Sequence, residues 1–211
     1  MQEFRSGLPV LAFSHETAFE RWLLAHPDAP GLWIKFAKKG KGLVSVTKQQ
    51  ALDVALCYGW IDGQAARYDE AYFLMRFTPR RPRSGWSQVN CARAETLITE
   101  GGMRPAGLAQ IHAAKTDGRW EAAYPPPSKA AVPDDLQEAL AANPKAAASF
   151  KSLSKSRRYM MLHGIATVRK ADTRARKIGE FITTLSRARR SPDCLRRLSA
   201  KSGDGFLPKI E

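Results

Sequence analysis

The sequence predicts an α+β protein, with an N-terminal α+β domain that carries a small sheet and a helical C-terminal domain. Three observations support this fold class. Short β-like runs alternate with amphipathic helices through residues 8–78. The proline-rich segment YPPPSKAAVP then interrupts the pattern, and apolar residues recur at helical spacing beyond it. We therefore expect domains at 1–130 and 131–190, and a basic, flexible tail at 191–211.

The first half of the chain is expected to alternate helices and strands. Ser14 can cap a helix in SHETAFERWLLAH. The run GLWIKFAKK alternates in character and predicts a strand whose exposed face carries Trp33 and Lys35. Thr47 and Gln50 have the spacing of a capping box that begins the next helix. The segments WIDG and AYFLMRFT supply further strands.

Helices dominate the rest of the prediction. One helix begins at about Ser87 and ends at a glycine pair, and Pro105 suits the first turn of the next. Three successive prolines in YPPPSKAAVP favour an extended, semi-rigid linker. Beyond the linker, the sequence predicts helices near 134–142, 144–153, 155–168 and 173–187.

Composition indicates a folded protein without a membrane span. The chain has 211 residues, of which 44% are hydrophobic and 26% charged, so it resembles ordinary globular proteins and not disordered ones. No run approaches the roughly 18 apolar residues of a spanning helix, and the N-terminus lacks the apolar core of a signal peptide. Cys57, Cys91 and Cys194 form no paired motif. We therefore expect reduced thiols and a cytoplasmic location.

The positive charge is concentrated in the C-terminal third. The formal net charge is +14, and residues 151–211 carry 16 Lys and Arg against 5 Asp and Glu. Such asymmetry favours nucleic acid or another polyanion as a partner, although a solvated basic face is the ordinary alternative. Within the basic stretch VRKADTRARKIGEF, aromatic residues that would stack on bases are lacking, apart from Phe181. The candidate polyanion-binding residues are Arg169, Lys170, Arg174, Arg176 and Lys177.

The stretch FTPRRPRSGWS, residues 77–87, combines three arginines with two prolines. Each proline pushes the preceding residue toward extended geometry, so Arg80, Arg81 and Arg83 are expected to splay from a stiff backbone. Arginine suits bidentate binding of carboxylate or phosphate. Ser87, at the start of the following helix, offers further anion contacts. The alternative is that these arginines pack on aromatic rings and carboxylates of the same protein, with Asp62 as the obvious partner.

Catalytic motifs are weak in this sequence. Cys57 is a conceivable nucleophile and Asp62 a conceivable general base, yet a cysteine on the buried face of a helix is usually part of the core. The HExxH, GxSxG and Walker motifs do not occur, and KKGKG at 38–42 fits a solvated hairpin loop better than a phosphate loop. We assign no catalytic residue, metal ligand or cofactor, and leave open whether the chain is an enzyme.

Several motifs together resemble the YdeI/OmpD-associated family, also described as bacteriocin-protection proteins. They are CYGWIDG, FTPRRPRSGWS with Asn90 after it, MRPAGLAQIHAAKTDGRWEAAY, and an R-x-Y motif followed by T-R-x-R-K-I. The resemblance spans about residues 10–188. It implies an α+β domain followed by a helical domain and implies no established reaction. Its signature positions are Trp60, Asp62, Gly63, Arg80, Arg81, Arg83, Trp86, Ser87, Asn90, Arg158, Tyr159, Thr173, Arg174 and Arg176.

The sequence thus supports a non-enzymatic bacterial stress or antimicrobial-resistance protein that binds a small polar or anionic ligand in a cleft. The expected ligand-binding residues are Trp60, Asp62, Arg80, Arg81, Arg83, Trp86, Ser87 and Asn90. One alternative is polyanion binding through the basic C-terminal third. Another is an uncharacterised hydrolase or transferase that uses Asp62, with Cys57 as a second candidate. The oligomeric state does not follow from the sequence.

Overall fold

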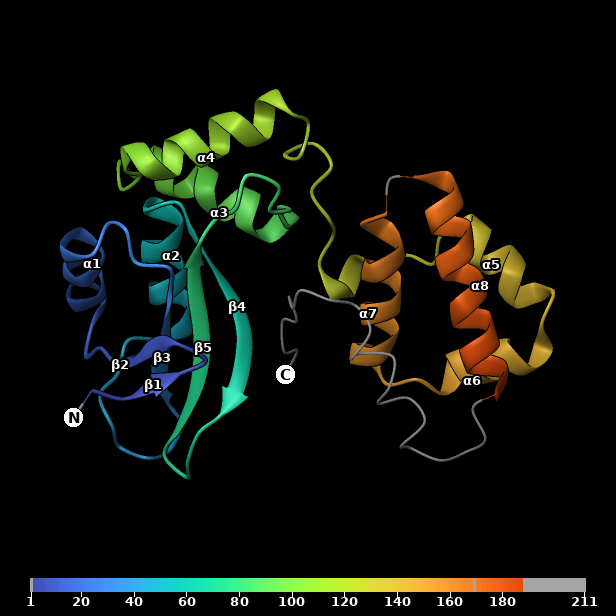
Figure 1. Cartoon of the computed structure of the whole chain (residues 1–211), viewed down its shortest axis with the longest axis horizontal. Helices are drawn as coiled ribbons and strands as arrows, with labels where there is room; N and C mark the ends of the chain where they lie inside the picture. Colours follow the sequence, from blue (N-terminus) through green and yellow to red (C-terminus); the bar gives the residue numbers. More distant parts are fainter. Residues whose placement is uncertain (1, 169, 188–211) are drawn as a thin grey trace. The chain divides into compact units, whose positions relative to one another are not determined.

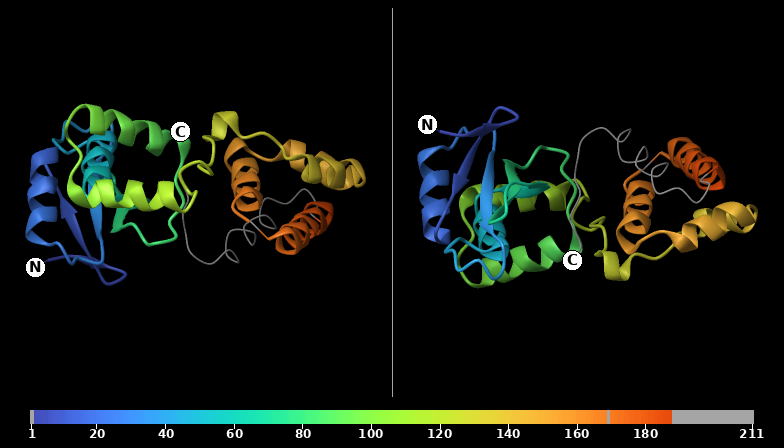
Figure 2. Two further views of the ribbon diagram at one scale, coloured as in Figure 1. Left: turned by 90° about the horizontal axis from the view of Figure 1, so that it is seen from above. Right: turned by 90° about the horizontal axis from the view of Figure 1, so that it is seen from below.

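The computed structural model describes residues 2–168 and 170–187 and divides the chain into two compact units. The described part of unit 1 spans residues 2–123, and that of unit 2 begins at Tyr124 (Figure 1). The described part of unit 1 holds a five-stranded sheet and four α-helices, whereas that of unit 2 is helical (Figure 2). The predicted α+β class is confirmed. Arg169, Cys194 and the predicted tail at 191–211 lie outside the described residues.

The sheet of unit 1 has the strand order β1-β2-β3-β5-β4. Strands β2 and β3 are parallel, and the other neighbours are antiparallel. The strands are β1 (Phe4–Arg5), β2 (Leu8–Ala12), β3 (Leu32–Ala37), β4 (Trp60–Arg67) and β5 (Tyr72–Pro79). The predicted strands at WIDG and AYFLMRFT correspond to β4 and β5, which form one hairpin.

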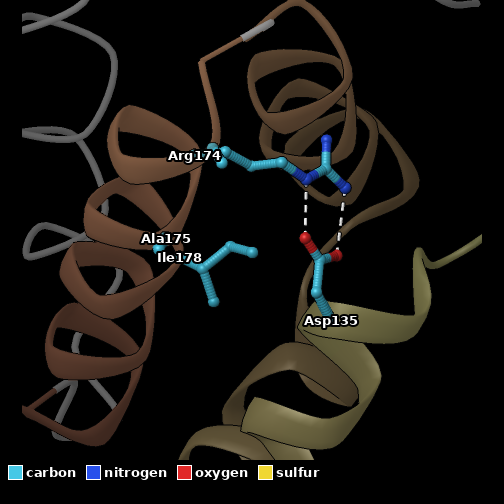
Figure 3. Close-up of a pocket in the computed structure, with 5 residues that line it drawn as sticks. Asp135, Arg174, Ala175 and Ile178 are labelled. Atoms are coloured by element: carbon cyan, nitrogen blue, oxygen red, sulfur yellow. Dashed lines mark hydrogen bonds and ion pairs between the residues drawn. The ribbon is translucent and has the colours of Figure 1, made fainter.

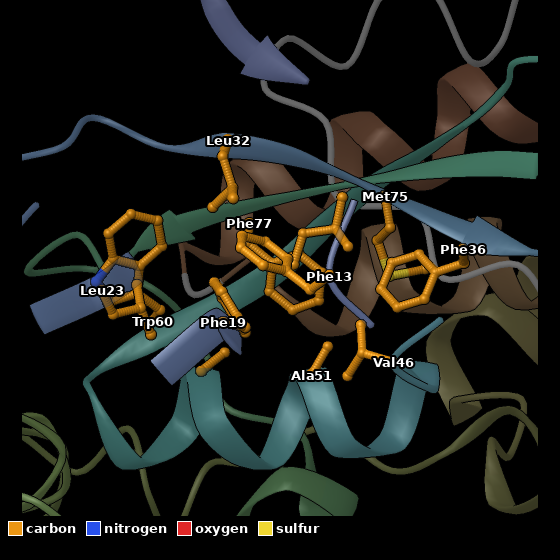
Figure 4. Packing of buried hydrophobic residues seen from close by; sticks show 12 residues of the cluster. Phe13, Phe19, Leu23, Leu32, Phe36, Val46, Ala51, Trp60, Met75 and Phe77 are labelled. Carbon is orange, nitrogen blue, oxygen red and sulfur yellow. The ribbon is translucent and has the colours of Figure 1, made fainter. Parts of the chain in front are cut away.

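Two helices, α1 (Glu16–Ala25) and α2 (Lys48–Cys57), share the main core of unit 1 with the sheet. Figure 4 shows this core between the strands and α2, where Phe19, Phe36 and Phe77 form one aromatic group. The Phe19 and Phe77 rings meet edge to face, with centroids 5.8 Å apart. Burial of such large apolar side chains is the main stabilising contribution to this layer.

Helices α3 (Gln88–Thr99) and α4 (Pro105–Thr116) belong to a second core, which also includes residues of α2. The approach of α4 to α2 depends on Gly107. A Cβ atom at this position would lie 2.5 Å from the carbonyl oxygen of Cys57 and 2.6 Å from that of Leu56, closer than such atoms can approach. Glycine is therefore required where the two helices meet.

Two local expectations are corrected by the structure. Trp33 is not on an exposed face: only 2% of its surface is accessible, and its indole N–H donates to the carbonyl oxygen of Arg5 at 3.1 Å. The first helix begins at Glu16 after His15, and no side chain caps it, so Ser14 is not its N-cap. The capping box of Thr47 and Gln50 is confirmed.

The described part of unit 2 is a small helical bundle. Its elements are the 3₁₀ turn η1 (Pro127–Lys129), α5 (Asp134–Ala141), α6 (Pro144–Ser152), α7 (Lys155–Ala166) and α8 (Ala171–Arg187). The four α-helices match the four predicted ones to within a few residues. Leu136, Phe150, Ile165 and Leu185 are buried in the common core. Within 2–168 and 170–187, no helix combines the length and apolar character needed to span a membrane.

Candidate functional site around Asp62 and Arg80

The candidate site lies where β4 begins and β5 ends. In this antiparallel pair, Trp60 lies opposite Pro79, and Asp62 lies opposite Phe77. The chain continues beyond Pro79 into residues 80–87, which we call the arginine-rich loop. The backbone N–H of Arg80 donates to the carbonyl oxygen of Gly59 at 2.9 Å, which ties the start of this loop to the turn before β4.

Arg80 is an internal residue of the loop. Its side chain lies over the Trp86 ring, with Cζ 3.5 Å from the ring centroid, and its Nη1 donates to the carbonyl oxygen of Gly85 at 3.2 Å. Only 5% of Arg80 and 2% of Trp86 are accessible to solvent. Because a cation over an indole face gains more when both are desolvated, this contact stabilises the loop from inside. Arg80 therefore does not splay into solvent.

The rest of the arginine-rich loop is held by further hydrogen bonds. The N–H of Arg81 donates to Oγ of Ser84, and the N–H of Ser84 donates back to the carbonyl oxygen of Arg81. The buried Arg119, which is paired with Asp117, donates to the carbonyl oxygen of Ser84 at 2.8 Å. These hydrogen bonds already restrict the conformation of the loop, so the loop would lose little conformational entropy when it binds a ligand. Sequence reasoning assigned no role to Arg119, although it lies in the quoted motif TDGRWEAAY.

Two of the three arginines have exposed side chains. Arg81 and Arg83 are exposed, in contrast to Arg80. Ser87 follows the loop as the N-cap of α3, and its Oγ accepts the backbone N–H of Asn90 at 3.1 Å. Its hydroxyl oxygen therefore already serves to cap the helix. Of the predicted set, Trp60 is buried in the main core, where it meets the Trp22 ring.

Asp62 is the most unusual group of the site. It is 8% accessible, yet its carboxylate accepts no hydrogen bond from another residue and forms no ion pair in the described part of the chain. Burial is the main cause that raises the pKa of Asp62 above its ordinary value. The positive charges of Lys48 and Arg80, and a hydrogen bond from its own backbone N–H, oppose this shift. The predicted pairing of Asp62 with an arginine is thus limited to attraction over a distance.

Two further buried polar groups near the loop lack partners among the described residues. Asn90 is 7% accessible, and no hydrogen bond of its side-chain amide is found. The indole N–H of Trp86 is fully buried and has no acceptor. Native proteins satisfy most of their buried polar groups, so each exception calls for an explanation. We call Asp62, Arg80, Trp86 and Asn90 the Asp62 cluster: Arg80 acts on Asp62 by its charge and contacts Trp86, and Asn90 lies in the first turn of α3, after Ser87.

The geometry gives Cys57 no features of a nucleophile. Cys57 and Cys91 are both free and buried in the second core. Burial raises the pKa of Cys57 and raises that of Cys91 to about 11, so both are thiols and not thiolates at neutral pH. Among residues 2–168 and 170–187, no group of three or more acidic, cysteine or histidine side chains is arranged to hold a metal ion.

Unit 2 has a pocket of about 300 Å³, lined by Asp135, Ala171, Arg174, Ala175 and Ile178. Figure 3 shows the ion pair at its edge, in which Arg174 donates from Nε and Nη2 to the two carboxylate oxygens of Asp135 at 2.6 and 3.0 Å. Nη1 of Arg174 donates to the carbonyl oxygen of Ile165 at 2.9 Å. A single arginine thus joins α5, α7 and α8.

This arrangement divides the candidate polyanion-binding residues. Arg174 is engaged in the bonds just described, and Lys177 is half-buried close to Gly164. Lys170 and Arg176 are exposed, and Arg169 lies outside the described residues. The described part of the predicted basic cluster therefore presents two exposed cations and not four.

Comparison with known protein families finds one matching family model in each unit. Residues 129–188 match the model of the family described as "Bacteriocin-protection, YdeI or OmpD-Associated". This segment, and not the whole chain, is similar to the YdeI/OmpD-associated family. Residues 11–110 match a separate model, described as "Domain of unknown function (DUF8412)", which contains the Asp62 cluster. No curated protein and no solved structure matches the chain.

Within the segment that matches the YdeI/OmpD-associated family model, several signature residues of the resemblance make structural contacts. Arg158 donates from Nη2 to the carbonyl oxygen of Lys151 and lies over the Phe150 ring at 5.3 Å. The Tyr159 hydroxyl donates to the carbonyl oxygen of Pro125 at 3.3 Å. With Arg174, these side chains connect helices and the segment that precedes them, so the motif of this domain is explained in part by packing.

Proposed function

We propose that unit 1 binds a small polar ligand through the Asp62 cluster, and that the protein acts by binding and not by catalysis. The observation that carries the proposal is Asp62, a residue that is 8% accessible and whose carboxylate has no partner in another residue of the described part of the chain. An unsatisfied buried polar group costs about 1–3 kcal/mol. A ligand that donates a hydrogen bond to Asp62 would recover this cost on binding.

The surroundings of Asp62 define the ligand further. Lys48 and Arg80 are the positive charges that act on the carboxylate, while Asn90 and the Trp86 indole offer further hydrogen-bonding groups. A ligand with both a donor and an acceptor group fits this set better than a simple anion does, because a simple anion would meet the Asp62 charge. The rigid arginine-rich loop supports binding, since its conformation is fixed beforehand.

The description of the family suggests the physiological setting. We infer that ligand binding in unit 1 contributes to stress or antimicrobial resistance, in keeping with the words "Bacteriocin-protection" in the description of the family that unit 2 matches. This inference rests on the family match, whereas the ligand-binding proposal rests on the geometry of unit 1. The two are tested separately.

The test is a thermal-shift screen of the full chain against amino acids, nucleosides, sugars, carboxylated metabolites and, as polyanions, short nucleic acids, at low and high salt. Selective binding to the native state raises the melting temperature. We expect a salt-resistant shift from a small polar compound that Asp62→Asn and Asn90→Ala both abolish. The matched control is Arg67→Ala, which changes an exposed arginine of the same sheet and should keep the shift.

Two outcomes would overturn the proposal. One is a ligand shift of the same size in wild type and Asp62→Asn. The other is a set of shifts from every polyanion that disappear with salt, because release of counterions is the mark of phosphate-backbone binding. Far-ultraviolet circular dichroism of each variant would show that a lost shift is not a lost fold.

A further inference from the structure

The loop between β3 and α2, residues 38–47, exposes two apolar side chains in a row. Leu43 is 44% accessible and Val44 is 80% accessible, whereas Val46 is buried. Elsewhere in the described chain, the large exposed apolar residues occupy separate positions, at Phe4, Leu24, Val89, Ile98 and Leu108. Isolated exposed apolar residues are normal on protein surfaces. An adjacent pair in a loop is a different case, because both side chains can enter the same apolar environment.

Both ends of this loop are fixed to unit 1. The N–H of Lys38 donates to the carbonyl oxygen of Ala71 at 2.8 Å, and the N–H of Val46 donates to that of Phe13 at 2.8 Å. The hydroxyl of Ser45 accepts the N–H of Ala37 at 3.0 Å. The chain therefore leaves the sheet and returns to it at defined points, and the residues between them form the tip.

The tip itself is built around glycine. Gly40 and Gly42 have φ angles of 81° and 64°, which residues with a side chain seldom adopt. These two turns come directly before Leu43, and no Cβ contact is found within 4 Å of either glycine. A side chain at either glycine would therefore meet open space, directly before the position where the apolar pair follows.

Lysines accompany the apolar pair. Lys39 and Lys41 are exposed and form no ion pair with another described residue. The sequence has no acidic residue between Lys35 and Asp53. The neighbouring β4–β5 turn contains two acidic residues: Asp69, whose carboxylate accepts the backbone N–H groups of Ala71 and Tyr72, and the exposed Glu70. The tip therefore combines apolar side chains with cations that have no counter-charge within the loop.

We propose that this loop is a peripheral membrane contact, in which Leu43 and Val44 enter the interface of an anionic bilayer while Lys39 and Lys41 contact lipid phosphates. Apolar side chains flanked by lysines have the composition of interfacial membrane anchors. Nucleic acid is the poorer partner, because the tip offers no aromatic ring for base stacking. The contact is reversible, and it is independent of the Asp62 cluster because it uses none of those residues.

The test is co-sedimentation of the full chain with vesicles of phosphatidylcholine alone or mixed with phosphatidylglycerol. We expect binding to the mixed vesicles only, and a loss of at least about tenfold for Val44→Asp. Lys39→Gln and Lys41→Gln should each weaken binding about fivefold, since one basic residue near an anionic surface contributes about that factor. Val89→Asp, at an exposed apolar position of α3, is the matched control and should bind as wild type.

Three outcomes would overturn the proposal. They are equal sedimentation of wild type and Val44→Asp, no sedimentation with either vesicle, and full competition by soluble glycerol phosphate, which would indicate a phosphate site without insertion. Retardation of single-stranded DNA that depends on Lys39 and Lys41 but not on Val44 would likewise assign the loop to nucleic acid. Val44 is highly exposed, so its substitution leaves the core of unit 1 unchanged, and a melting curve checks this.

Discussion

The Cζ atom of Arg80 lies 3.5 Å from the centroid of the Trp86 ring, and both side chains are buried. This contact gives the positive charge of Arg80 an internal partner that is not Asp62. The carboxylate of Asp62 therefore remains available for another hydrogen-bond donor. The Arg80–Trp86 contact thus connects the packing of the arginine-rich loop with the proposed binding of a ligand at Asp62.

Loss of the Arg80–Trp86 contact should destabilise unit 1. We expect Trp86→Ala to lower its free energy of unfolding by about 3–5 kcal/mol, because a large buried ring leaves a cavity. Urea denaturation followed by tryptophan fluorescence measures the change. Arg83→Ala removes an exposed arginine of the same loop and should change stability by less than about 0.5 kcal/mol. Equal effects of the two substitutions would contradict the buried role of Trp86.

Asp62→Asn should stabilise the protein at neutral pH. The raised pKa of Asp62 means that the native state binds its proton more tightly than the unfolded state does. Stability therefore falls as pH rises from the ordinary aspartate range through the raised pKa, and the full cost is present above that raised pKa. Removal of this charge should gain about 1–3 kcal/mol.

The advantage of the Asn variant should shrink as the solution is acidified, because the protonated Asp62 no longer carries a buried charge. Melting temperatures of wild type and Asp62→Asn across this pH range test the prediction. A variant that is less stable than wild type at pH 7 would show that Asp62 has a stabilising partner. A gain in stability together with a loss of ligand binding would fit a residue retained for function.

Gly107 should tolerate no side chain. We expect Gly107→Ala to destabilise unit 1 by about 1–3 kcal/mol, since the added Cβ would overlap the carbonyl oxygens of α2. Gly179→Ala is the matched control, because it lies in α8 with open space around the added methyl group. That variant should gain up to about 1 kcal/mol from helix propensity. Thermal denaturation of both variants measures the difference, and the same sign for both would contradict the close approach of α4 to α2.

Arg174 should contribute to the stability of unit 2 through the hydrogen bonds of its guanidinium group and not only through its positive charge. Arg174→Lys keeps the charge but loses the paired bonds to Asp135 and the bond to the Ile165 carbonyl. We expect a loss of about 1 kcal/mol, kept small because the ion pair is partly exposed. Arg176→Lys, at an exposed position of the same helix, is the control. Chemical denaturation compares them, and equal stability would show that the bonds contribute little.

The Asp135–Arg174 pair also predicts a pH dependence. Arg174 lowers the pKa of the Asp135 carboxyl by hydrogen bonding, so its contribution is present above the ordinary aspartate pKa and is lost as pH falls through the lowered one. Asp135→Asn should remove this part of the acid sensitivity of unit 2. The measurement is the denaturation midpoint between neutral and acidic pH, and an unchanged acid profile would contradict the prediction.

The sequence by itself determined the α+β class, the helices of unit 2 and the cap at Thr47, because these follow from local periodicity and capping chemistry. It also indicated the segment in which the Asp62 cluster lies. The prediction for Trp33 was wrong. Its position between the apolar residues Leu32 and Ile34 predicted that it lies on the exposed face of the strand, but the structure buries it. Strand β1, which is distant in sequence, supplies the hydrogen-bond acceptor for its indole and explains the difference.

Tertiary structure alone decided which arginine is internal. Arg80, Arg81 and Arg83 stand in similar sequence surroundings, but only Arg80 follows directly on the strand that pairs with β4, and only its side chain lies over the Trp86 ring. In the same way, Arg174 and Arg176 differ only by the helix face that they occupy. Burial and hydrogen-bond geometry depend on contacts between distant segments, so the role of each cation was fixed only when those segments came together.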